Sequence, residues 1–489
     1  MERQTNKLLV TIAIFVATFM TAVEGTIVTT AMPTIVGSLH GIEIMNWVFS
    51  IYLLTNAMFT PIYGKLADKV GRKPIFIIGT LIFIIGSALC GVSNSMMTLI
   101  ISRAIQGIGA GAMMPVALTI LADLYDSEKR AKLLGLNSTA WGVASVVGPL
   151  AGGFIVETVG WHWIFYINVP IGLVLIGLIF FYLVEPKRQR EAKKMDIMGS
   201  FFLMLTLLSL LLGFQYLSDS GLGWQVLSFA VVAVVALIIF IVVEKRAEDP
   251  VISLGLFSNH LFVIVNVTAA LASGFLMGIE VYIPMWMQGV LGLSAGVGGI
   301  ILVPLSVLWV WGSSLASRWM MQRSIRWVLN VSLSIILIGG LAMFLAPIST
   351  PFVLFFFITA LIGIGMGATT VTGTIISQNS VQSDQMGMAT SFNTLVRTIG
   401  QTVMVSIFGI TLNMVTAAQL DKANLSEDAD IMNQLVNPQT AKLLPEDLLG
   451  SLRQVLYEGL HVVYGVAVIL VIIALAFTQT LRKKRATIE

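Results

Sequence analysis

Two acidic side chains and one basic side chain fall inside long apolar stretches of the sequence. Glu24 and Glu280 each lie about 6–8 residues from the outer end of an expected membrane helix, roughly 9–12 Å deep, and Arg103 lies at a similar depth. Such charges cost from about 2.5 to over 10 kcal/mol unless they are paired or hydrated. Because burial and a nearby cation shift a carboxyl pKa in opposite directions, a carboxylate in this setting can exchange protons. We therefore predict that all three residues couple proton movement to function, although Arg103 could instead extend to the outer interface.

The same carboxylates could bind an amphipathic cation, with aromatic side chains adding cation–π contacts and amides adding hydrogen bonds. The candidate substrate-binding residues are Glu24, Trp47, Tyr52, Asn137, Trp141, Glu280, Tyr282, Trp286, Gln288 and Asn393. The aromatic side chains could equally face lipid or pack in the core. The sequence also leaves open whether Glu280 binds protons or the charge of a substrate.

A short charged turn, GKLADKVGRKP at residues 64–74, separates two expected membrane helices. Gly64 permits close packing, and Asp68 could meet a helix N-terminus or an arginine. Arg72 could pair with Asp123 at the end of a later helix. These four residues form a candidate conformational latch; the alternative is a basic loop that only sets topology.

A second glycine-rich element, AWGVASVVGPLAGG at residues 140–153, lies within an expected membrane helix. Pro149 removes a backbone hydrogen bond. Gly148, Gly152 and Gly153 leave a smooth face that another helix can approach closely. The element could have a functional role or could be a packing face only.

These residues must be positioned by membrane helices. Of the 489 residues 57% are hydrophobic and 11% are charged, against about 25% charged in an average soluble protein, which excludes a soluble enzyme. A membrane-spanning helix needs about 20 apolar residues. Fourteen such stretches are expected, near residues 9–32, 46–64, 74–92, 97–121, 133–156, 163–184, 197–217, 224–244, 261–288, 296–316, 326–346, 352–377, 388–415 and 459–480.

The basic residues support an even number of spans. Most of the 28 Lys and Arg residues fall in segments that are cytoplasmic when both termini are cytoplasmic. Cytoplasmic loops carry an excess of Lys and Arg, so this orientation is the expected one.

The two halves of the sequence contain similar stretches at a constant offset. QGIGAGAM at residues 106–113 aligns with IGIGMGAT at residues 362–369, and the same offset relates Asn137 to Asn393. Repeated halves packed around a central site are typical of secondary transporters. The fold class expected is an all-α integral membrane protein with two six-helix bundles and two extra central helices.

The domain limits follow from this repeat. Residues 1–190 form the expected N-terminal six-helix bundle, 191–255 the two inserted helices, and 256–489 the C-terminal six-helix bundle. The polar segment 416–458 is expected outside the cell. It could be a lid over the exit or a tolerated insertion.

Several function classes are excluded by residue usage. A single cysteine and four scattered histidines favour no Cys-rich metal site, and no cofactor other than the coupling proton is expected. The chain carries no nucleophile–base pair, no phosphate-binding loop and no nucleic-acid signature, so an enzyme, an ATP-driven pump and a nucleic-acid partner are not expected.

Taken together, these motifs resemble those of the major facilitator superfamily, and within it the fourteen-helix drug:proton antiporter family. The resemblance covers nearly the whole chain. It depends on the turn at 64–74, RAIQG at 103–107, GPLAGG at 148–153, EGTIVTTAMPTI at 24–35, WVFSIYLL at 47–54, WHWIFYINVPIG at 161–172 and PMWMQGVLGLS at 284–294.

The sequence departs from the family pattern at three places. Glu24 replaces the usual Asp, Ala144 replaces a usual glycine, and Ser317 replaces the acid of the second-half turn. The longer reach of Glu24 puts the substrate range in doubt.

Gly148, Pro149, Gly152 and Gly153 are similar to the family's antiporter motif, which implies export. The resemblance thus implies a proton-coupled multidrug efflux antiporter, associated with antibiotic resistance, in a bacterial plasma membrane. Its partners would be small amphipathic, cationic compounds, protons and the lipid bilayer, and it would act as a monomer. A symporter, or an exporter dedicated to one metabolite, lipid or signalling molecule, remains the alternative. A membrane sensor that binds without transporting is a further reading.

Overall fold

The chain folds into helices at every position where a membrane span is expected. The computed structural model describes residues 5–125, 127–185, 196–221, 223–247, 250, 254–381, 386–423 and 431–481. Among these, thirteen helical segments are long and apolar enough to cross a membrane. The fifth expected span lies in α5, where the described apolar stretch is the shorter Val146–Thr158. Fourteen spans therefore stay a prediction.

The helices group into two compact units. Unit 1 comprises Met1–Ala31, Trp47–Leu210 and Phe229–Val251, and unit 2 comprises Met32–Asn46, Leu211–Ser228 and Ile252–Glu489. The three-part division at residues 190 and 255 stays a prediction.

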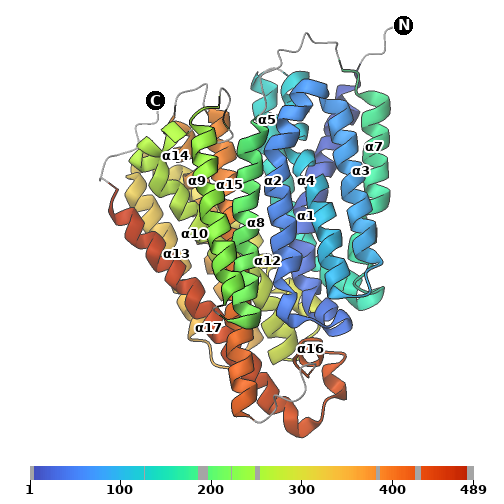
Figure 1. The fold of residues 1–489 in the computed structure, drawn as a ribbon, viewed down its shortest axis with the longest axis vertical. Coiled ribbons are helices and arrows are strands. Elements are labelled where there is room, and N and C mark those ends of the chain that lie inside the picture. Colours follow the sequence, from blue (N-terminus) through green and yellow to red (C-terminus); the bar gives the residue numbers. More distant parts are fainter. Residues whose placement is uncertain are drawn as a thin grey trace. The chain divides into compact units, whose positions relative to one another are not determined.

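The helices that supply most of unit 1 come first in the chain, and Figure 1 shows α1 to α4 and α7 running alongside one another. A core of apolar side chains from these five helices holds unit 1 together. The bounds are α1 (Lys7–Leu39), α2 (Asn46–Val70), α3 (Arg72–Gly91), α4 (Met96–Leu124), α5 (Ser127–Thr158), α6 (Trp163–Tyr166), α7 (Asn168–Tyr182), α8 (Ile197–Ser220) and α9 (Trp224–Glu244).

The remaining helices belong to unit 2. Their bounds are α10 (His260–Met285), α11 (Ala295–Ile300), α12 (Val303–Gln322), α13 (Ile325–Phe344), α14 (Phe352–Asn379), α15 (Met386–Lys422), α16 (Ile431–Val436) and α17 (Glu446–Gln479). The expected helix at 261–288 is not uniform, because α10 ends at Met285 and passes into a π-helical turn at Trp286–Val290. Such turns often occur at functional sites.

The glycine repeat has the same packing role in both units. In α4, Gly107 and Gly111 lie against backbone carbonyl groups of α2, and Gly109 between them lies against α3. In α14, Gly363 and Gly367 lie against α12, and the glycine between them lies against α13. A side chain at any of these positions would collide with backbone, so the glycines permit the close helix approach expected of small-residue faces. This correspondence supports the predicted internal repeat.

The polar segment near the C-terminal end is helical for much of its length. α17 begins at Glu446, so the last part of the segment 416–458 forms the start of the last long helix. Asn433 of α16 accepts hydrogen bonds from the backbone N–H groups of Gly41 (3.0 Å) and Ile42 (2.8 Å) within unit 2. The segment thereby binds the backbone that follows α1.

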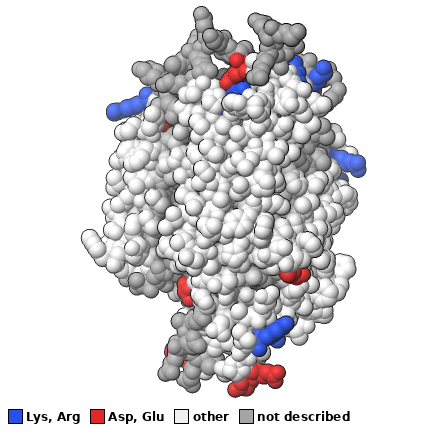
Figure 2. All heavy atoms as spheres, turned by 90° about the vertical axis from the view of Figure 1, so that its right-hand side faces the viewer, with Lys and Arg blue, Asp and Glu red and all other residues white. Residues whose placement is uncertain are grey.

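The surface carries the pattern expected of a lipid-facing protein. On the face shown in Figure 2, acidic and basic side chains gather toward the two ends, and a broad area between them carries almost none. Large apolar side chains are exposed along α9, including Val231, Val234 and Ile238. Helices are one of the two structures that satisfy their own backbone polar groups in lipid.

Candidate functional site

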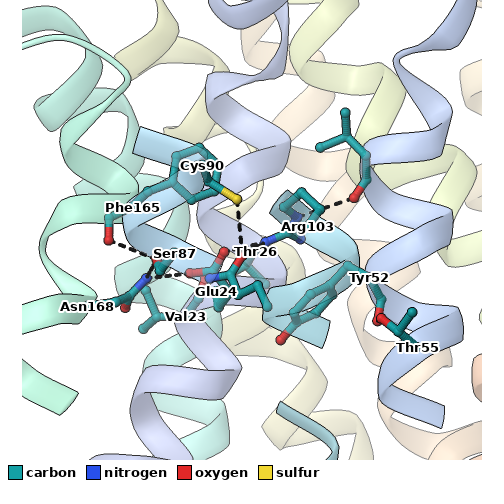
Figure 3. Close-up of polar contacts among 12 residues, drawn as sticks. Val23, Glu24, Thr26, Tyr52, Thr55, Ser87, Cys90, Arg103, Phe165 and Asn168 are labelled. Carbon is teal, nitrogen blue, oxygen red and sulfur yellow. Dashed lines mark hydrogen bonds and ion pairs between the residues drawn. The ribbon is translucent and has the colours of Figure 1, made fainter. Parts of the chain in front are cut away.

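The centre of unit 1 contains a buried ion pair between α1 and α4. Glu24 and Arg103 are each only 1% exposed, and Nη1 of Arg103 donates a hydrogen bond to Oε1 of Glu24 (Figure 3). The guanidinium also donates to Oε1 of Gln106 at 2.8 Å and to the carbonyl oxygen of Val48 at 3.2 Å. Arg103 is therefore paired inside the protein and does not extend to the interface. A buried pair of this kind persists only with such additional hydrogen bonds.

The second oxygen of the carboxylate is bound by a residue that sequence reasoning missed. Nδ2 of Asn168, the first residue of α7, donates to Oε2 of Glu24 at 2.7 Å and to Oγ of Ser87 at 3.0 Å (Figure 3). The Ser87 hydroxyl in turn donates to the carbonyl oxygen of Phe165 at 2.8 Å. The signal was present in the sequence, because Asn168 is an amide that lies inside an expected span.

Two further side chains surround the guanidinium. Cζ of Arg103 lies 4.0 Å from the centre of the Tyr52 ring, a cation–π geometry. Sγ of Cys90 lies 3.7 Å from Oε1 of Gln106, and both side chains are fully buried. Tyr52 is thus placed against Arg103, which accounts for its burial without invoking a substrate.

The glycine-rich face of α5 packs onto α1 next to Glu24. A side chain at Gly148 would collide with the Thr26 hydroxyl, and a Cβ at Gly152 would lie 2.9 Å from the carbonyl oxygen of Ile27. Pro149 and Gly153 are buried as well. The predicted motif therefore lies against the helix segment that carries the acidic residue, within the same unit.

The predicted latch residues are partly assembled. Arg72 forms an ion pair with Asp123. A carboxylate that sequence reasoning missed, Glu185, accepts hydrogen bonds from the backbone N–H groups of Arg72 (2.7 Å) and Lys73 (3.4 Å) at the start of α3. An acidic side chain is favourable there because it satisfies otherwise unpaired N–H groups. The close packing predicted at Gly64 is not observed among the described residues, because a Cβ placed there would meet no atom of another element within 4 Å.

Three predicted residues cannot be placed in this arrangement. The side chains of Asp68, Asn137 and Trp141 lie outside those that the structure describes. Their roles in the latch and in substrate binding stay predictions.

Unit 2 carries the second intramembrane acid. Glu280 lies on α10, is half-buried, and makes no hydrogen bond or ion pair with the described part of the chain. Two residues further on, the hydroxyl of the buried Tyr282 donates to Oδ1 of Asn46 at 2.7 Å. An acid inside a membrane span is functional by default, but whether Glu280 binds protons or substrate stays open.

Trp286 and Gln288 occupy the π-helical turn. The Trp286 ring is fully buried and lies 5.3–5.8 Å from the ring centres of Phe355, Tyr457 and Tyr464. The Gln288 side chain is also buried. Trp47 of α2, in unit 1, is half-buried.

Asn393 belongs to a hydrogen-bond network between three helices. Its Nδ2 donates to Oδ1 of Asn266 at 2.9 Å, and its Oδ1 accepts from Thr374 at 3.3 Å. Asn266 donates onward to Oγ of Ser377 at 2.9 Å. The network joins α10, α14 and α15.

A basic residue on α15 was not predicted as functional. Nε of this residue, Arg397, donates a hydrogen bond to Oγ of Ser273 at 3.2 Å.

Comparisons with known proteins agree with this architecture. The chain is 32% identical to multidrug transporter protein MdtP of Bacillus subtilis, covering 98% of this chain and 94% of that protein. It is 33% identical to multidrug resistance protein 3 of the same organism, covering 96% and 94%. Its fold resembles that of a bacterial homolog of the human lysosomal transporter Spinster, with a TM-score of 0.68 at 20% identity over 98% of each chain.

A family model supplies the assignment. The model described as Major Facilitator Superfamily matches residues 14–405, which include both glycine repeats and the buried ion pair. Together with the helical fold and the transporter relatives, this match shows that the chain belongs to the major facilitator superfamily of membrane transporters.

Proposed function

We propose that the chain is a proton-coupled efflux antiporter for amphipathic, cationic compounds, of the fourteen-helix drug:proton family. The observation that carries the proposal is the carboxylate of Glu24, which is fully buried and bound by Arg103 on one oxygen and by Asn168 on the other. The names of the relatives, multidrug transporter protein MdtP and multidrug resistance protein 3, support multidrug export. We further propose that the protein acts as a monomer in a bacterial plasma membrane with both termini cytoplasmic.

Coupling would arise from competition at the carboxylates. A carboxylate that carries a proton has lost the charge that attracts a cation, so proton entry from outside would release the substrate and substrate entry from inside would release the proton. Glu24 has a neighbouring cation in Arg103, whereas Glu280 has no such partner among the described residues. We therefore place the competition between proton and cation at Glu24 and assign to Glu280 a further negative charge that attracts the cation.

The energetics give a measurable signature. One pH unit supplies about 1.4 kcal/mol, which sustains about a tenfold gradient. A membrane potential of about 100 mV supplies about 2.3 kcal/mol per charge moved. One proton exchanged for one monovalent cation moves no net charge, so only the pH difference would drive it. Exchange of one proton for a neutral compound would be driven by both the pH difference and the membrane potential.

The test uses everted membrane vesicles that contain the full chain. Adding ethidium or tetraphenylphosphonium should move protons out of the acidified lumen of wild-type vesicles, and nigericin but not valinomycin should abolish cation accumulation. Glu24→Gln should abolish proton movement. Glu280→Gln should weaken cation binding while neutral substrates still move protons. Glu43→Gln, which changes an exposed carboxylate, serves as the matched control.

The outcomes separate the alternatives. If cations bind to purified protein but move no protons in wild-type vesicles, proton antiport is wrong. If a substrate moves protons in the same direction as itself, the protein is a symporter. If Glu24→Gln retains full coupling, the carboxylate of Glu24 is not the proton carrier.

A further inference from the structure

The carboxylate of Glu24 is bound by two donors of different chemistry. Arg103 bonds Oε1 through a guanidinium, which has five N–H groups and no acceptor. Asn168 bonds Oε2 through an amide, which has two N–H groups on one side and an acceptor oxygen on the other. Only the amide can therefore present either a donor or an acceptor to the same carboxyl oxygen.

We propose that Asn168 is a positioning residue for proton exchange at Glu24, donating to Oε2 when the proton is absent and turning its amide to accept from the acid O–H when the proton is present. This inference rests on the proposed function, because it assumes that Glu24 carries the coupling proton. It places the proton on Oε2 and not on Oε1, where a new O–H would face the N–H groups of Arg103.

The neighbours of Asn168 permit this reversal. In the structure Nδ2 of Asn168 donates to both Oε2 of Glu24 and Oγ of Ser87, while the Ser87 hydroxyl donates to Phe165. When the amide turns, Oδ1 takes the place of Nδ2 and can accept from the Glu24 acid and from a rotated Ser87 hydroxyl. The proton that forms the O–H bond comes from hydronium in the outside solution, which leaves a water molecule behind.

Other titratable or charged groups that face Glu24 also influence the pH profile of transport. They are Arg103 from α4, Tyr52 from α2 and Cys90 from α3. Tyr52 lies against the guanidinium, and Cys90 bonds to Gln106, so both are placed on the arginine side of the site. Neither is hydrogen-bonded to Oε2, and they are left unchanged in every variant.

The test compares Asn168→Leu and Asn168→Gln in the vesicle assay across pH. Asn168→Leu removes a bond from each form of Glu24, and the bond to the charged carboxylate is the stronger of the two by about 1–1.5 kcal/mol. Only this difference moves the proton equilibrium, so the pH midpoint of coupled transport should move to alkaline pH by about one unit. Asn168→Gln keeps the amide and should return the midpoint toward wild type.

The matched control is Asn266→Leu. Asn266 is an equally buried asparagine whose Nδ2 donates to a serine hydroxyl, Ser377, but to no carboxylate. The variant Asn266→Leu should lower the yield of folded protein and leave the pH midpoint of coupled transport unchanged. An unshifted midpoint in Asn168→Leu, or an equal shift in Asn266→Leu, would overturn the inference.

Infrared difference spectroscopy provides a readout that does not require transport. The carbonyl band of protonated Glu24, identified by its loss in Glu24→Gln, should move to higher frequency in Asn168→Leu because the acid has lost its acceptor. If Asn168→Leu folds poorly, Ser87→Ala should move the midpoint in the same direction by less. Wild-type vesicles without proton movement refute the proposed function, whereas proton movement with an unaltered carbonyl band refutes only the role of Asn168.

Discussion

Removing Arg103 should destabilise the protein far more than removing the pair as a whole. Arg103→Met leaves the carboxylate of Glu24 buried without its cation, and breaking a buried pair on one side costs about 3–5 kcal/mol. Glu24→Leu leaves the guanidinium unpaired and should cost a similar amount. The double variant replaces both charges with apolar groups of similar size, a change that is often neutral, so it should lie within about 2 kcal/mol of the wild-type free energy of unfolding.

The measurement is reversible unfolding of purified protein in mixed micelles of dodecylmaltoside and SDS, followed by tryptophan fluorescence. Arg72→Gln is the control, because its pair with Asp123 is partly exposed and such pairs contribute at most about 1 kcal/mol. The penalty in Arg103→Met should also fade as the pH falls, since Glu24 then takes up a proton and its charge disappears. A tightly coupled buried pair would be refuted if the losses of unfolding free energy in Arg103→Met and Glu24→Leu simply added up in the double variant. It would also be refuted if Arg103→Met lost no more unfolding free energy than the control Arg72→Gln.

Three further predictions use the same purified protein. Gly152→Val should lower the free energy of unfolding by about 1–3 kcal/mol, because its Cβ would press on the Ile27 carbonyl and overpacking carries that cost. Glu185→Gln should cost about 1 kcal/mol in the same assay by weakening the cap of α3, and an unchanged value would dismiss that role. Asn433→Ala should speed amide hydrogen exchange at Gly41 and the next residue; protection equal to wild type would contradict the observed bonds.

The fold was largely predictable because the membrane restricts the choices. An apolar run of about 20 residues in lipid has to be a helix, so the run lengths alone placed every long helix. The departures arise where local geometry decides. The π-helical turn at Trp286–Val290 is a local change of backbone hydrogen bonding that an apolar run does not reveal. The early start of α17 at Glu446 lies in a polar stretch that hydropathy does not detect.

In the candidate site, the sequence pointed most clearly to the charged residues, because a charge is costly to place in lipid. Glu24 and Arg103 stood out because an unpaired charge in lipid is costly, and the structure places them together. Asn168 did not stand out, because a neutral amide costs far less to bury and the sequence does not show what it faces. Asn393 stood out through the repeat, yet its amide is engaged by Asn266 and Thr374, so its role in substrate binding stays a prediction.

The burial of Cys90 has a practical consequence for experiments on this chain. It is the single cysteine in the sequence, it is fully enclosed, and its thiol is directed at Gln106. Maleimide reagents react with accessible thiolates, so the native protein should show little background labelling. Single cysteines introduced at chosen positions would then report, by their reactivity from either side of an intact cell, which loops are outside and which faces of α1 become wet during transport.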